Sequence, residues 1–289
     1  MAAYPMRAGG ADEVAAVPVV RRLLVDLEAP FARDWCGDPF LTALFDALSM
    51  SFPVGEQFFI DSVRAGLERL SAERRGEFAE RTRGFVGQEA THRRIHALFN
   101  AQLARQGSVN TWERHGLARI AWMADVDRRH WLGATAAYEH FTAILAQWLL
   151  RHPQVLEGAE PRLRTMWLWH SAEETEHRSV AFDLYHAIGG DRRWRRRWFR
   201  RASFFFVTDA TWQTLSNLRR AGTLWHGRTW RSAARHLFGR GGLVRESFGP
   251  WREYFRADFH PDHQPDDLAR AWLDENSATY TLAGSASGR

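Results

Sequence analysis

The chain has no lysine, one cysteine and no long apolar run, and the last two features each exclude a class of protein. A single thiol, Cys36, can form neither an internal disulfide nor a cysteine-rich zinc site. The apolar stretch in the arginine-rich region, Phe204 to Val207, is far shorter than the roughly 20 residues that cross a bilayer. The N-terminus also lacks the basic start and apolar run of a secretory signal, so we expect a cytoplasmic protein.

The composition favours a soluble globular protein. Of the 289 residues, 45% are apolar and 25% are charged, which suits one main core with an appended tail. All 39 basic residues are arginine, and the net charge is +5. Because the arginines gather between Arg192 and Arg201, we expect a local surface role for them and no binding of nucleic acid.

Helical periodicity dominates the sequence, and the alternation typical of strands is nearly absent, so the predicted fold class is all-α. Pro39 and Pro53 bracket an early helix or turn. The segment 152–161 holds two prolines and a glycine and must be a turn. Long helices are expected at about Glu56–Leu70, Ala72–Gln106, Trp131–Arg151 and Arg162–Ile188, with a connecting helical segment at Trp112–Trp131.

Two Glu-x-x-His pairs, Glu89 with His92 and Glu174 with His177, fall on expected helices. Residues three apart differ by about 60° around a helix axis, so each pair presents a carboxylate and an imidazole on one face. About one such pair is expected by chance in a chain of this composition. The pairs alone are therefore weak evidence for a metal site.

A further glutamate stands at a matching distance before each pair. Glu56 precedes Glu89 by 33 residues (89 − 56), and Glu139 precedes Glu174 by 35 (174 − 139). In an antiparallel hairpin, two residues reach the same height when both are equally far from the turn. The midpoints, 72.5 and 156.5, fall at the expected start of the second helix and inside the segment 152–161. The sequence therefore predicts two helical hairpins, each with one lone glutamate and one Glu-x-x-His pair.

This donor set is that of ferritin-like di-iron and di-manganese four-helix bundles. Four carboxylates and two imidazoles suit two divalent ions, with iron favoured and manganese or zinc as alternatives. His96, His170 and Glu173 fall on or near the same faces, as additional ligands or as residues that hydrogen-bond the ligands. The alternative is that the glutamates lie on solvated faces and the histidines in a core. The predicted metal ligands are Glu56, Glu89, His92, Glu139, Glu174 and His177.

Five segments carry a family resemblance: FPVGEQFF, GFVGQEATHRRIH, YEHFTA, WLWHSAEETEHRSVAFDLY and YFRADFHPDH. Together they resemble the bacterial family described as predicted metal-dependent hydrolases, over about Phe52 to Trp272. The resemblance implies a metal enzyme with a ferritin-like ligand pattern.

Two reactions suit such a site. In the favoured one, an oxidase or oxygenase reaction, two ferrous ions reduce dioxygen and a hydrophobic small molecule is oxidised, with an electron donor as partner. In the alternative, a dinuclear site lowers the pKa of a bound water and delivers hydroxide to an ester, amide or phosphate. A non-catalytic metal-binding bundle is the third interpretation. No catalytic residue beyond the ligands is predicted.

We expect an N-terminal extension at 1–40, the ferritin-like bundle at 41–190 and a helical C-terminal extension at 191–289. The arginines and aromatic residues at 192–212 either pack on the bundle or lie peripherally on the inner face of a membrane, as basic aromatic helices can. We interpret the segment Phe259–Asp267 as a lid or packing loop, with a second metal site at its histidines and aspartates as the alternative. A homodimer is a candidate assembly.

Overall fold

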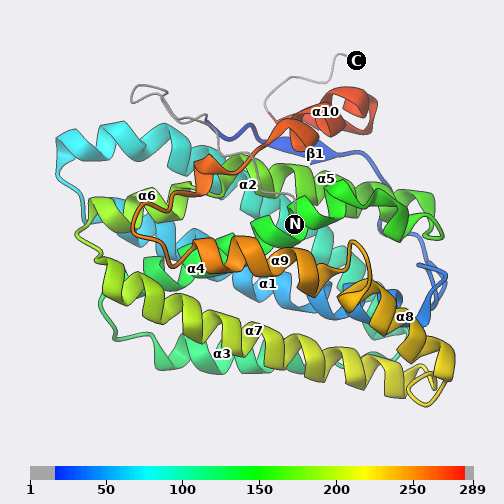
Figure 1. Ribbon diagram of the computed structural model, residues 1–289. Coiled ribbons are helices and arrows are strands. Elements are labelled where there is room, and N and C mark those ends of the chain that lie inside the picture. The colour runs from blue at the N-terminus through cyan, green and yellow to red at the C-terminus, as the bar shows by residue number, and fades with distance from the viewer. Residues whose placement is uncertain (1–16, 284–289) are drawn as a thin grey trace.

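A computed structural model describes residues 17–283, and the interpretation of the first residues as carrying no secretory signal falls outside this range. Within it the fold is all-α, as predicted, with one short antiparallel pair of strands (Figure 1). No helix of the described residues is long and apolar enough to span a bilayer. The helices are α1 (Pro39–Glu68), α2 (Ala72–Arg105), α3 (Thr111–Trp122), α4 (Arg128–Arg151), α5 (Pro161–His177), α6 (Val180–Ala187), α7 (Arg192–Arg220), α8 (Gly227–Phe238), α9 (Leu243–Glu253) and α10 (Asp267–Glu275), and the strands are β1 (Arg21–Leu23) and β2 (Tyr280–Leu282).

Four long helices surround the centre of the protein. Helix α1 packs along α2 and α4 along α5, and the two pairs meet through contacts of α1 with α4 and of α2 with α5. The two turns lie where the midpoints predict them. Ser71 caps α2 by accepting a hydrogen bond from the Arg74 backbone N–H, and a 3₁₀ turn at Pro153–Leu156 joins α4 to α5.

The first helix differs from the prediction, because α1 runs through Pro53 as one 30-residue helix. Proline has no N–H to donate to the carbonyl four residues before it, which here is Ser49. That carbonyl instead accepts a hydrogen bond of 2.9 Å from the side-chain amide of Asn100 on α2. The neighbouring helix thus supplies the donor that the proline removes, and the helix continues.

The expected helix at Arg162–Ile188 is two helices. Helix α5 ends at His177, Arg178 and Ser179 form a turn, and α6 then continues to Ala187. Arg178 reaches across this turn and donates to the backbone carbonyl of Gln264 at 2.6 Å. No proline or glycine marks the break, so the local sequence could not show it.

The C-terminal helices pack against the four long ones. Helix α7 lies along α1 and α4, with α3 beside it (Figure 1). Strands β1 and β2 pair with Arg21 opposite Leu282, so the two ends of the described chain meet next to α2. Gly84 permits this approach, since a Cβ there would lie 2.4 Å from the backbone oxygen of Pro18.

Candidate metal centre

The structure brings all six predicted metal ligands into one buried cluster. Each is at most 4% exposed, and they come from α1, α2, α4 and α5. The Nε2 atom of His177 lies 3.2 Å from Glu89 Oε1, 3.3 Å from Glu139 Oε2 and 3.5 Å from Glu174 Oε1. Nδ1 of His92 lies 3.2 Å from the same oxygen of Glu174. The two predicted hairpins therefore meet at the height that their spacing implies.

The donor atoms form two adjoining groups. Glu89, His92, Glu174 and His177 offer ligand atoms within 4.8 Å of one another, and so does a second group that adds His96 and His170 to Glu56. The groups meet at Glu174, whose Oε1 is also 3.0 Å from Nε2 of His170. A buried histidine and glutamate site suited to two metal ions follows from this arrangement. The two extra histidines predicted from the sequence lie beside the cluster.

The donor atoms of this cluster have few hydrogen bonds of their own. Both carboxylate oxygens of Glu56, Glu89 and Glu139 are buried without a hydrogen-bond partner among the described residues. So are Nδ1 of His92 and Nε2 of His177. Each unpaired buried polar atom costs about 1–3 kcal/mol, so a cluster of them is unfavourable unless cations satisfy it. These residues fit two divalent ions on that ground.

The pKa shifts of the buried carboxyl groups also favour bound cations at this cluster. Burial raises the pKa of Glu56 well above its usual value, and the Glu89 and Glu174 carboxylates raise it further. Burial also dominates the raised pKa of Glu139. For Glu174, burial is outweighed by His177 and the other imidazoles, which lower its pKa. Carboxylates crowded in this way resist ionisation until cations neutralise them.

Each histidine of the two Glu-x-x-His pairs is hydrogen-bonded to the residue that directly precedes the glutamate of the other pair. Nε2 of His92 donates to Glu173 at 3.0 Å, and Nδ1 of His177 donates to Gln88 at 2.9 Å. These bonds leave the other ring nitrogen of each histidine facing the cluster. Glu173 thus hydrogen-bonds one of the predicted ligands, His92, and also pairs with Arg21.

Gln88 is a residue of the site that the sequence analysis did not single out, although its position directly before Glu89 matches that of Glu173 before Glu174. Its amide nitrogen donates to Glu176 at 2.7 Å. Arg21 on β1 binds the same Glu176 through two nitrogens, at 2.7 and 2.8 Å, and also reaches Glu173 at 3.2 Å. The N-terminal strand thus fixes both residues that orient the histidines. No local signal marks Arg21, because its partners lie more than 150 residues away.

His96 and His170 are hydrogen-bonded to each other at the edge of the cluster. Nε2 of His96 and Nδ1 of His170 share a hydrogen bond of 2.6 Å, and Nδ1 of His96 lies 2.9 Å from the hydroxyl of Ser49. Burial lowers the pKa of His170 to about 4 and that of His96 well below its usual value, so both rings are neutral. They sit where they can bind a metal or hydrogen-bond a ligand, as the sequence suggested.

Two other histidines lie away from the cluster. His140 bonds the backbone carbonyl of Pro250 at 3.1 Å, away from the cluster. His260 in the segment Phe259–Asp267 bonds Asp183 at 2.8 Å, and Arg81 pairs with the same carboxylate at 2.8 Å. Asp183, His260 and Asp262 offer donor atoms within 4.8 Å of one another, as in a metal site, but Arg81 already compensates the charge of Asp183. These contacts pack the segment onto α6.

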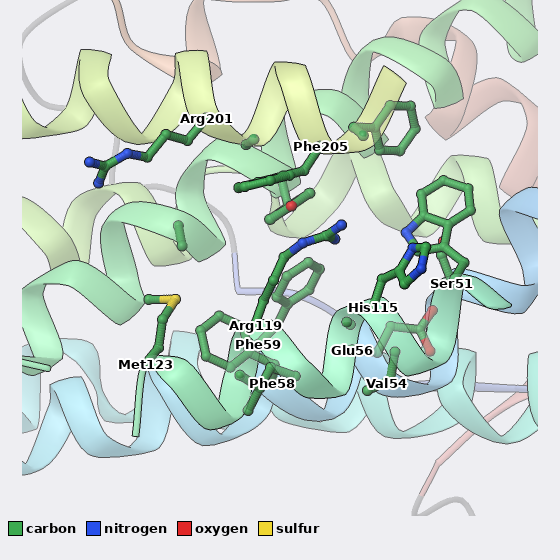
Figure 2. A pocket seen from close by; sticks show the side chains of 18 of the residues that line it. Ser51, Val54, Glu56, Phe58, Phe59, His115, Arg119, Met123, Arg201 and Phe205 are labelled. Atoms are coloured by element: carbon green, nitrogen blue, oxygen red, sulfur yellow. The ribbon is translucent and has the colours of Figure 1, made fainter. Parts of the chain in front are cut away.

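A cavity of about 590 Å³ adjoins the metal centre, between α1, α3, α4 and α7 (Figure 2). Its wall is mostly apolar and aromatic. Glu56 belongs to this wall and to the buried cluster, so the cavity adjoins the cluster at this residue. The side chains lining it include Phe58, Phe59, Trp112, Met123, Tyr138, Trp198, Phe205 and Phe206, with Arg119, His115 and Arg201 among the polar ones.

The fold and the site together define an all-α protein with a buried carboxylate and histidine site for two metal ions, open to an apolar cavity. The sequence profile of the family described as predicted metal-dependent hydrolase matches residues 19–265. Because the match covers most of the chain, the protein belongs to this family, and the resemblance drawn from its motifs is confirmed. No curated protein and no solved structure matches the chain.

Proposed function

We propose that the protein is a metal-dependent enzyme that converts an apolar small molecule at a two-metal centre. One observation carries the proposal: Glu56 lies both in the buried donor cluster and in the wall of the apolar cavity. A molecule held against Phe58 and Phe59 would therefore present one end to the metal site. Apolar walls with a few convergent polar groups are typical of small-molecule sites.

The six predicted ligands would hold the two ions, and Glu173 and Gln88 would keep His92 and His177 in the orientation that binds them. A pair of divalent ions supplies Lewis acidity and a water of lowered pKa when bound. The aromatic wall excludes bulk water, which strengthens every charge interaction inside the site.

For the reaction, hydrolysis is the first candidate, because the family description names it. This reverses the preference drawn from the donor set alone. The substrate would be an ester or amide with a long apolar part, since the cavity wall offers little to a polar molecule.

Oxygen-dependent oxidation of the apolar molecule is the second candidate. The observation in its favour is the chemistry of the site: four carboxylates with imidazoles are the donor set of di-iron bundles, and the cavity beside Glu56 is lined by carbon. This reaction needs iron and an external electron donor.

Metal analysis tests the proposal. Protein purified without chelator should carry about two ions per chain, and Glu89→Ala and His177→Ala should each lose metal. Glu157→Ala and His263→Ala, which change exposed residues of the same types, are the controls. Unchanged metal content in both ligand variants contradicts the proposal.

The same preparations separate the two reactions. Ester or amide turnover with zinc or manganese that is indifferent to dioxygen supports hydrolysis. An oxygen-dependent absorption change of the ferrous protein, with no esterase turnover, supports oxidation.

A further inference from the structure

Helix α7 exposes an apolar stripe with arginines at both ends. Its inner face packs on α1 and α4, while Phe204, Val207 and Trp212 are 64%, 58% and 62% exposed on the outside. Positions 193, 200 and 219 each lie within about 60° of position 204 around the helix axis. The exposed arginines of this face are Arg193 and Arg200 before the apolar residues and Arg219 after them.

The outer face of α7 carries only positive charge. Asp209 is the only acidic residue in the sequence of this helix, and it is buried. Arg119 and His115 of α3 pair with Asp209 at 2.5 and 3.0 Å, so its charge is compensated inside the protein. Asp191 caps the start of α7, and the exposed acidic residues of the neighbouring α3 segment are Glu113 near the start of that helix and Asp125 just after its end.

The mouth of the cavity opens beside this stripe. Four of the residues lining the cavity are exposed, and all of them lie on α3 or α7: His115, Ala118, Trp122 and Arg201. Trp122 is 70% exposed, and Leu117 next to it on α3 is 52% exposed. Figure 2 shows Arg201 far along the cavity from Glu56. The exposed part of the cavity wall therefore lies on the surface that α3 and α7 share.

We propose that this α3–α7 face, defined by Leu117, Trp122, Phe204, Val207, Trp212 and the arginines of α7, docks on an anionic lipid bilayer and takes the apolar substrate from it. Exposed aromatic residues with flanking arginines are the pattern of helices that lie in the membrane interface, where arginine heads meet phosphate and the rings enter the acyl boundary. Delivery of substrate rests on the proposed function, whereas the docking itself does not.

Vesicle flotation tests the docking with the full chain. Phosphatidylcholine vesicles with and without phosphatidylglycerol are the probe, at low and high salt. The wild type should float with the anionic vesicles and release at high salt. Each arginine near an anionic surface raises the partitioning of a protein onto the membrane roughly 5-fold. The double substitution R193E/R200E should therefore weaken binding to the anionic vesicles by an order of magnitude or more. F204S/W212S should weaken it without changing the salt dependence.

Matched controls come from exposed residues of other helices. Phe248→Ser on α9 changes a phenylalanine that is 59% exposed, and Arg83→Glu changes an exposed arginine on α2. Both should float as the wild type does, and equal thermal melts would show that all variants fold. The proposal is overturned if the wild type ignores anionic vesicles or if the controls lose as much binding as the α7 variants.

Two further outcomes are informative. A wild-type dimer that F204S/W212S converts to monomer would mean that a second copy covers the face, and the membrane proposal would fall. Metal content measured on the same samples separates the two proposals. Loss of vesicle binding with two ions retained leaves the enzyme proposal intact, and the reverse result leaves the docking intact.

Discussion

The crossed hydrogen bonds at the metal centre lead to a quantitative prediction. His92 donates to the carboxylate of Glu173 and His177 to the amide oxygen of Gln88. We consider Glu173→Leu and Gln88→Leu, which remove the acceptor and keep most of the volume. In each variant a buried imidazole N–H loses its partner and the ring is free to turn away from the donor cluster.

The two variants should differ in size of effect. A hydrogen bond to a charged group is worth about 1.5–3 kcal/mol and one between neutral groups about 0.5–1.5 kcal/mol. Removing a partner of a ligand histidine commonly costs 10–100-fold in metal affinity. Glu173→Leu should therefore weaken one metal site by about 100-fold and Gln88→Leu by about 10-fold.

Competition with a chromophoric chelator measures both affinities, with manganese or zinc as the ion. Gln102→Leu is the matched control, because Gln102 is buried on the same helix as Gln88 but bonds the backbone carbonyl of Glu28 and the side chain of Arg105, away from the donor cluster. It should lower stability and leave metal affinity unchanged. Wild-type affinity in both test variants, or a larger loss in Gln88→Leu, would refute the assignment of these residues as orienting partners.

Three other predictions follow. Burial raises the pKa of Asp46 to about 7 despite the hydrogen bond from Trp35, so the folded state favours the protonated acid. Its stabilising contribution is fully present below about pH 4 and is lost as the pH rises through 7. The Asp46→Asn substitution should thus raise the free energy of unfolding by up to about 4 kcal/mol at pH 8 and leave it unchanged at pH 4, as measured by urea denaturation. A variant whose stability depends on pH as that of the wild type does would contradict this. Asn100→Ala should cost about 1–3 kcal/mol, because the Ser49 carbonyl opposite Pro53 loses its donor; a urea midpoint equal to the wild type would mean that water replaces it. Removal of metal by a chelator should lower the melting temperature. The loss of stability should be about 2.7 kcal/mol if the free metal concentration had been 100-fold above its Kd. Equal melting temperatures with and without metal would argue against the site.

The cluster of predicted ligands could be found from the sequence because each Glu-x-x-His pair lies within one helix and the same arrangement occurs twice along the chain. Helical spacing puts Glu89 with His92 and Glu174 with His177, and the distances to the preceding glutamates give the height at which the hairpins meet. Such spacings can be recognised in the sequence because each helix is regular on both sides of the predicted ligands. The structure brings the predicted ligands together for that reason.

The features that could not be predicted depend on contacts between distant segments. Where helix α1 continues through Pro53, the Ser49 carbonyl that the proline leaves without a donor is satisfied by Asn100 of another helix. The turn after His177 is held by the hydrogen bond from Arg178 to the backbone carbonyl of Gln264. Arg21 reaches Glu173 and Glu176 from a strand whose own partner is near the other end of the chain. None of these residues carries a local pattern that differs from an ordinary loop or helix.

The metal cluster and the cavity therefore have different origins in the chain. The donors lie on α1, α2, α4 and α5, whereas the mouth of the cavity is built by α3 and α7, which the sequence presents as a connection and a tail. Of the cluster, only Glu56 takes part in the cavity wall. Substitutions at Trp122 or Phe205 can thus change which molecule enters while every donor atom stays in place. The choice of substrate and the binding of metal are separable in this fold, and measurements of one need not report on the other.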